Sequence, residues 1–198
     1  METATPMLMD DTDFGLTSKE ANRNFLENTL RKKSSAKKVG SIKLLKKDTV
    51  LPVYQTGGDS DEGYYWAEHE NSIVWLVKYR KWRRNWFPDG SKLLTQVALW
   101  RDDETALLPH DFAAKMFFGF ILKRHGMVMS DKEQTERGAR FWKRRLVEAL
   151  EKGLHVAFVD LSNQQLQFVK TPEVMNDLFK EAWSRDRAKM NFRWIIWK

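Results

Sequence analysis

The chain has 198 residues, no cysteine and a formal net charge of +7 at pH 7. The lack of cysteine excludes thiol catalysis, disulfide frameworks and zinc–thiolate sites. The positive charge favours anionic partners, whereas an aromatic share of 13% with nine tryptophans predicts that most of the chain folds.

Residues 1–48 are predicted to form a flexible, basic N-terminal arm. The opening METATPMLMDDTDFG has no basic region and no long apolar core, so we expect no secretory signal. Thr17 and Glu20 have capping-box spacing, which predicts a short helix over ANRNFLENTLRKK. Residues 31–47 then carry eight basic residues and no acid. This segment is either a solvated linker or an arm that binds an anionic partner.

A long β-hairpin is predicted after the loop TGGDSDEG at residues 56–63. Residues 73–82 and 93–101 are rich in β-branched and aromatic residues, and the turn sequence FPDGS lies between them. Alternation places apolar residues on both faces of the first strand near its base. We therefore expect the base of the hairpin to be buried on both sides and its outer end to be polar.

From residue 111 onward, helical and strand patterns alternate. The patterns predict a helix ending at Gly126, the strand MVMSD, a helix over 135–152 ended by Gly153, and a strand over 154–160. A turn, the strand LQFV, a helix capped by Thr171 with Pro172 at its first position, and the final strand FRWIIWK follow. No window is long enough to span a membrane. Residues 49–198 are thus predicted to form one α+β domain with a mixed, mostly antiparallel sheet and flanking helices.

This order of elements resembles the GNAT family of N-acetyltransferases. In that family a strand, a phosphate-binding loop and a helix precede a second strand and a second helix, which carries the pattern N-x-x-A-x-x-F-Y. The second helix here reads TERGARFW from Thr135 to Trp142, so Phe141 matches the core aromatic of the family. The phrase SDKEQTERGARFWKRRL also resembles phage-encoded GNAT-like proteins, some of which have lost the acetyl-CoA site and serve in virions.

The resemblance implies a cofactor site that this sequence does not match. The family loop Q/R-x-x-G-x-G/A corresponds here to RDDETALLPHD at residues 101–111, which has no glycine and four acids that would repel a pyrophosphate. The proton-donating tyrosine of the family falls at Trp142, whose indole cannot do that work. Gln134, Arg137 and Gly138 are the remaining cofactor-binding candidates. We therefore expect no cofactor, and acetyl-CoA only if the chain is an enzyme.

Metal and hydrolytic sites have little support in the sequence. The four histidines are scattered, and the cluster EHE at residues 68–70 would point its acids away from its histidine on a strand. Asp131 and Asp160 end predicted strands, where paired acids can form a site but also cap loops. We therefore predict no metal site and name no catalytic residue.

The outer half of the hairpin, VKYRKWRRNWFPDG, holds five basic and four aromatic residues. Cations can neutralise phosphates while rings stack on bases, tryptophan can anchor a protein contact, or the cations can lie on the rings within the fold. These three interpretations remain open. The predicted partner-binding residues, expected to be exposed near the tip, are Arg80, Trp82, Arg83, Arg84 and Trp86.

The leading hypothesis is a non-catalytic, GNAT-like, phage-associated protein that binds a protein or a nucleic acid and not a membrane. It would be a virion component or a host-directed factor, located in the virion or the host cytoplasm. One alternative is an acyl-CoA-dependent N-acyltransferase with an atypical cofactor loop. Another is a nucleic-acid-binding accessory protein that uses the basic arm and the hairpin tip.

Overall fold

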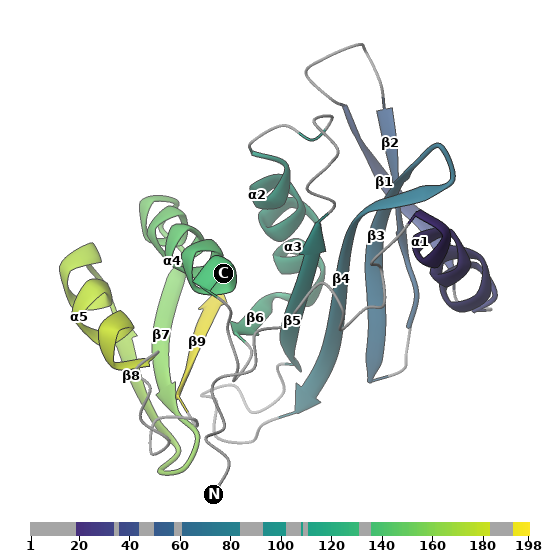
Figure 1. Ribbon diagram of the computed structural model, residues 1–198. Coiled ribbons are helices and arrows are strands. Elements are labelled where there is room, and N and C mark those ends of the chain that lie inside the picture. The colour runs from purple at the N-terminus through teal and green to yellow at the C-terminus, as the bar shows by residue number, and fades with distance from the viewer. Residues whose placement is uncertain are drawn as a thin grey trace, which may run out of the picture. The chain divides into compact units, whose positions relative to one another are not determined.

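The computed structural model describes residues 19–33, 36–43, 50–57, 61–83, 93–101, 108, 111–130, 136–182 and 192–198, with backbone only at 19, 83, 93–98, 100, 101, 136, 137 and 180–182. Its elements in chain order (Figure 1) are α1 (Lys19–Phe25), the π-helix η2 (Leu26–Arg31), β1 (Lys37–Lys43), β2 (Val50–Gln55), β3 (Glu62–His69), β4 (Ser72–Arg83), β5 (Leu93–Arg101), α2 (Phe112–Met116), the π-helix η3 (Phe117–Leu122), α3 (Lys123–His125), β6 (Met127–Ser130), α4 (Glu136–Glu151), β7 (His155–Asp160), β8 (Gln165–Val169), α5 (Pro172–Ala182) and β9 (Phe192–Trp197). Every strand pair with a described register is antiparallel, so the predicted α+β fold class is confirmed.

The chain forms two compact units rather than the single domain predicted for residues 49–198. The N-terminal unit contains Asp10–Lys81 and Val97–Ala113, and its strands have the order β1-β2-β3-β4. The C-terminal unit contains Trp82–Gln96 and Ala114–Lys198, and its strands have the order β6-β9-β7-β8. Strand β5 contributes residues to both units.

Strand β4 confirms the predicted hairpin and its doubly buried base. It spans Ser72–Arg83 and is the neighbour of β5 in the strand order. Every residue from Ile73 to Val77 is buried, so the strand has apolar side chains packed on both of its faces. The strand connects to β3 through Glu70 and Asn71, which have φ angles of 48° and 58°. Two consecutive positive φ values are typical of the tight turns that join hairpin strands.

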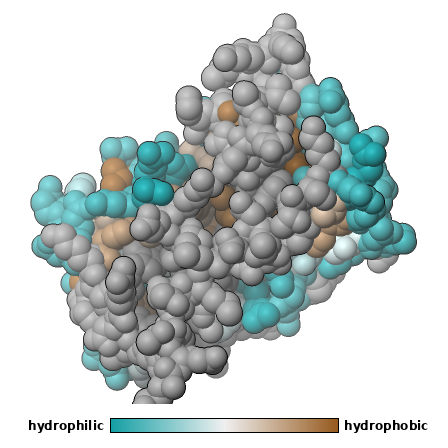
Figure 2. Space-filling view, viewed as in Figure 1, coloured by the Kyte–Doolittle hydropathy of each residue, from teal (hydrophilic) through white to brown (hydrophobic). Residues whose placement is uncertain are grey.

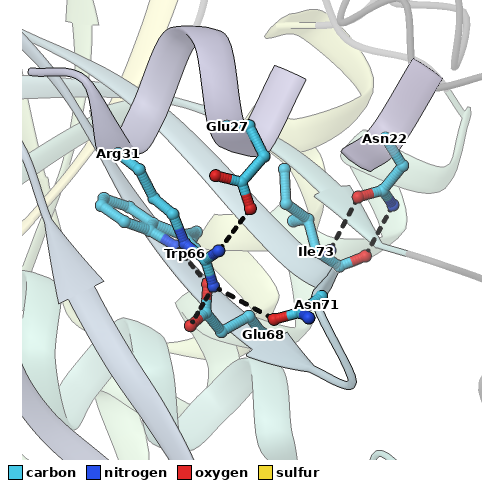
Figure 3. A network of polar contacts seen from close by, with 7 residues as sticks. All are labelled: Asn22, Glu27, Arg31, Trp66, Glu68, Asn71 and Ile73. Carbon is cyan, nitrogen blue, oxygen red and sulfur yellow. Dashed lines mark hydrogen bonds and ion pairs between the residues drawn. The ribbon is translucent and has the colours of Figure 1, made fainter. Parts of the chain in front are cut away.

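The N-terminal helix packs within the first unit in its described residues, whereas the sequence predicted residues 1–48 as a separate arm. Leu26 and Leu30 of η2 are fully buried, and β1 pairs with β2. The apolar stripe of this helix is thin, but the buried Asn22 also attaches the helix to β4 through hydrogen bonds. Its Nδ2 donates to the Ile73 carbonyl at 2.8 Å, and the Ile73 amide donates to its Oδ1 at 2.7 Å (Figure 3).

The C-terminal unit follows the predicted alternation of helices and strands. The helical segment from α2 to α3 ends at Gly126, which has a φ of 76°, and Gly153 with a φ of 68° follows α4. Thr171 accepts a backbone hydrogen bond from Val174 at the start of α5, as expected of a cap. Helices α4 and α5 lie against one side of β7, β8 and β9 (Figure 1), where the Phe179 ring meets Trp194 at 6.2 Å.

Candidate partner-binding surface

A charged cluster forms where β3 and β4 lie side by side in the N-terminal unit. Their register places Glu62 directly opposite Arg80. The Arg80 Nε donates to Glu62 Oε1 at 2.7 Å, and the Lys78 Nζ lies 3.8 Å from Glu62 Oε2. The hydrogen bond from Arg80 lowers the pKa of Glu62, and the charges of Lys78 and Lys33 lower it further, against the effect of burial. Glu62 is therefore ionised at neutral pH and orients the cations around it.

Tyr64 lies beside this cluster on the same face of the sheet. It pairs with Lys78 across the strands, and the Lys33 Nζ lies 4.8 Å from the centre of its ring. The ring of Phe25 meets it edge-on at 6.0 Å. Burial, with a contribution from Glu62, raises the pKa of the Tyr64 phenol. The ring is therefore a neutral platform with a cation over its face.

A second aromatic pair continues this face toward β1. Tyr54 stacks on Trp66 with ring centres 5.2 Å apart, and Lys38 lies opposite Tyr54 in the register. We call the set of Lys33, Lys38, Tyr54, Glu62, Tyr64, Lys78 and Arg80 the basic–aromatic face. The side chains of Lys78 and Arg80 are 41% and 56% exposed. Hydrophilic residues line the right-hand edge of the described surface in Figure 2, beside a smaller apolar patch, where Figure 1 shows α1 and its neighbouring strands. This face can offer cations to an anionic partner.

Polar contacts fix the end of the helix that precedes Lys33. The Arg31 Nη2 donates to Glu68 at 3.0 Å and to Asn71 at 3.5 Å, and Arg31 also pairs with Glu27 (Figure 3). The Trp66 indole donates to the other oxygen of Glu68 at 3.4 Å. Although burial opposes it, the two carboxylates raise the pKa of Arg31. The network joins the end of η2 to the β3–β4 turn, which sets the position of Lys33.

The structure separates the predicted partner-binding residues. Arg80 belongs to the basic–aromatic face. Trp82 was predicted to be exposed, but it is half-buried. It packs against a cluster of the C-terminal unit that includes Met127, Met129 and Ile195. A half-buried indole leaves less ring for a partner, and its role in binding stays a prediction. The side chain of Arg83, and the whole of Arg84 and Trp86, lie outside the described residues.

The predicted cofactor-binding residues are not brought into a described site. Gln134 and the Arg137 side chain lie outside the described residues, and Gly138 is half-buried in the first turns of α4. Most of the predicted loop counterpart at residues 101–111 is also outside them. Trp142, at the position of the family's tyrosine, is only 2% exposed and packs edge-on against Phe117. Its observed contacts are those of a core residue.

The acids considered in the sequence have structural contacts. Glu68 of the EHE cluster binds Arg31 and Trp66, and Asp160 accepts hydrogen bonds from the backbone amides of Ser162 and Asn163 at 2.8 and 3.4 Å. Asp160 therefore caps the β7–β8 turn, whereas Asp131 lies outside the described residues. Among the residues that the structure describes, no group of three histidine, aspartate or glutamate side chains could hold a metal ion.

Most of the basic–aromatic face was not predicted from the sequence. Lys33 and Lys38 were assigned to the arm, and Glu62 and Tyr64 were given no role. One signal was present, because EGYYWAEH contains three consecutive aromatic residues, which favour a strand. The pairing of Glu62 with Arg80 had no local signal, since it depends on the register.

Comparisons with protein-family models and with curated protein sequences find no match for this chain. In the described part of the chain, no helix has the length and apolar character needed to cross a membrane.

Proposed function

We propose that the chain is a non-catalytic, GNAT-like protein that binds a macromolecular partner through the basic–aromatic face. The observation that carries the proposal is the set of exposed cations oriented by Glu62 on a rigid sheet. Lys78 and Arg80 come from one strand, and Lys33 is held by the Arg31 network. Charges fixed on regular elements lose less conformational freedom on binding than charges on loops.

An acidic protein surface fits this face better than a nucleic acid does. Tyr54 already stacks on Trp66, and Tyr64 already contacts Phe25 and Lys33, so base stacking would have to displace these contacts. Glu62 also reduces the positive potential that attracts phosphates over a distance. Nucleic-acid binding through the basic segments and the hairpin tip remains the alternative proposal.

The GNAT-like assignment and the absence of catalysis are part of the same proposal. The observed order β5, helix, β6, α4, β7 supports the resemblance. The burial of Trp142 supports a core role at the position where the family has its proton donor. An acyltransferase would need another proton donor and an atypical cofactor loop. The resemblance to phage-encoded proteins extends the proposal to a virion component or a host-directed factor, in the virion or the host cytoplasm.

A pull-down from the native source with the double variant Lys78→Gln, Arg80→Gln tests the surface. We expect the captured partner to fall by roughly tenfold or more relative to the wild type, because two contacts to charged groups are lost. Quantitative mass spectrometry of the bound fraction, with and without nuclease treatment, measures the loss. Nuclease resistance is expected for a protein partner.

The matched control for this experiment is Lys37→Gln, Lys123→Gln. It removes the same charge from two exposed lysines, of which Lys37 pairs with Gln55 and not with the residues of the basic–aromatic face. Equal losses from both double variants would show that net charge, and not this face, determines capture. Loss of capture on nuclease treatment would favour the nucleic-acid alternative.

The absence of a cofactor is tested by thermal unfolding with acetyl-CoA. A ligand that binds only the folded state raises the unfolding temperature. We expect acetyl-CoA to raise it no more than the same concentration of inorganic phosphate does, since phosphate groups alone can bind cationic side chains. A clearly larger rise with acetyl-CoA would favour the acyltransferase alternative.

A further inference from the structure

Arg145 is a buried cation on α4 with unused hydrogen-bonding capacity. Its side chain is 8% exposed, and its Nη2 donates to Glu148 Oε1 at 2.8 Å. Its Nε and Nη1 are also buried and have no hydrogen-bond acceptor among the described residues. Buried donors are almost always paired, because a donor that is removed from water and finds no acceptor in the protein costs free energy. Glu148 therefore satisfies only one of the three guanidinium nitrogens.

Two aromatic rings surround this guanidinium. Its central carbon lies 5.3 Å from the ring centre of Phe141 and 6.0 Å from that of Phe118. The rings attract the cation electrostatically, but they offer no lone pair to its N–H groups. Burial lowers the pKa of Arg145 and the charge of Arg144 lowers it further, against the opposing effect of Glu148. The surroundings therefore only partly compensate the charge.

The neighbouring charges leave an excess of cations at this place. The Lys152 Nζ lies 5.6 Å from the same Phe118 ring that Arg145 faces, and Arg144 is close enough to affect the Arg145 pKa. Among the described groups that these contacts join, three cations accompany the carboxylate of Glu148. Phe118 belongs to the π-helix η3, and short π-helical turns are frequent at functional sites.

A phosphate group matches these features. It carries close to two negative charges at neutral pH and three strong acceptor oxygens, whereas Glu148 makes a single hydrogen bond to Arg145. Arginine binds phosphate with two N–H groups at once when its geometry allows. The Glu148 side chain is 32% exposed and can turn into solvent. Its departure would open the guanidinium to an incoming oxyanion.

We propose that Arg145, with Arg144 and Lys152 nearby, forms a binding site for a phosphate group that displaces the Glu148 carboxylate. The site lies entirely in the C-terminal unit and shares no residue with the basic–aromatic face. It is therefore independent of the proposed protein-binding function. The phosphate can be free or can be carried by a phosphorylated side chain.

Calorimetric titration of the full chain with inorganic phosphate, at constant ionic strength set with chloride, tests the site. The wild type should show saturable binding, and Glu148→Gln should bind several-fold more tightly because a competing anion is removed. Arg145→Met, which keeps the volume and removes the donors, should weaken binding by roughly tenfold or more. Arg140→Gln removes the same charge from an exposed position on the same helix and should bind as the wild type does.

Glu148→Gln keeps the test decisive if Arg145→Met does not fold. A purely structural pair between Arg145 and Glu148 predicts that this variant loses stability and gains no affinity for phosphate. Absence of saturable binding in both the wild type and Glu148→Gln would overturn the proposal, as would equal affinities of Arg145→Met and Arg140→Gln. A parallel titration with O-phosphoserine separates the sources, since tighter binding than inorganic phosphate supports a phosphorylated side chain and equal binding supports the free ion. Acetate binding as tightly as phosphate would overturn the assignment to phosphate.

Discussion

Asn22→Ala is expected to lower the free energy of unfolding by about 2 to 6 kcal/mol, because each of two buried polar groups left unpaired costs about 1 to 3 kcal/mol. The Asn22 amide makes two short hydrogen bonds with the backbone of Ile73, in the geometry of a neighbouring strand. Alanine leaves both the carbonyl and the amide of Ile73 without their partner. Urea unfolding followed by tryptophan fluorescence measures the loss.

Asn28→Ala is the control for this prediction. Asn28 is on the same helical segment but is exposed, and its side chain accepts a hydrogen bond from Lys32 at 2.9 Å. Its replacement should change stability by less than about 0.5 kcal/mol. The interpretation that Asn22 attaches the helix to the sheet is falsified if the two variants lose the same stability. Limited proteolysis should also cleave the Asn22→Ala variant near η2 before it cleaves the Asn28→Ala variant.

The attachment through Asn22 shows why the N-terminal segment was assigned to an arm. Its sequence signals were a thin apolar stripe and a run of basic residues, both of which favour a solvated segment. The stability of such a helix comes mainly from tertiary packing rather than from its own residues. Here Leu26 and Leu30 are fully buried and Asn22 binds a residue 51 positions away. A contact at that separation leaves no pattern in a local window.

The elements predicted correctly are those with strong local signals. Residues 73–82 are β-branched and aromatic, and Gly126 and Gly153 follow helical periodicity with the positive φ that favours glycine. Strands β1, β2 and β3 were not predicted, because β1 and β3 mix lysine, glycine or glutamate with their apolar residues and β2 contains a proline. Their pairing supplies the backbone hydrogen bonds that their composition does not favour.

The residues of the candidate sites also divide into those with a local sequence signal and those without one. Arg80 stood out because it belongs to a dense basic and aromatic run. Its partner Glu62 is 18 positions earlier, and only the β3–β4 register brings the two together. Arg145 was not distinguished from the outward-facing Arg140 and Arg144 of the same helix. Yet it lies three residues after the buried Trp142 and four before the buried Ala149, which is the spacing of an inward-facing stripe. That spacing was a usable signal.

Gly63→Ala is expected to destabilise the protein by about 2 to 6 kcal/mol, because overpacking a tight site costs about 1 to 3 kcal/mol and a broken buried hydrogen bond adds about 1 to 3 kcal/mol. A Cβ atom at Gly63 would lie 2.5 Å from the Tyr79 hydroxyl and would also collide with the Thr56 carbonyl oxygen. That hydroxyl donates to the Thr56 carbonyl at 2.7 Å and accepts from the Gln55 amide at 2.9 Å. The methyl group would therefore separate strand ends that these bonds join.

Gly119→Ala is the matched control for this substitution. No atom lies within 4 Å of a Cβ built there, and the residue is exposed in a helical segment. Alanine in a helix is about 0.5 to 1 kcal/mol more favourable than glycine, so this variant should be unchanged or slightly more stable. Thermal and urea unfolding of both variants measure the contrast. If Gly63→Ala unfolded within about 0.5 kcal/mol of the wild type, the close approach of Tyr79 to this glycine would not hold in solution. Because Tyr64 follows Gly63 directly, the same variant should also weaken partner capture by the basic–aromatic face, whereas Gly119→Ala should not.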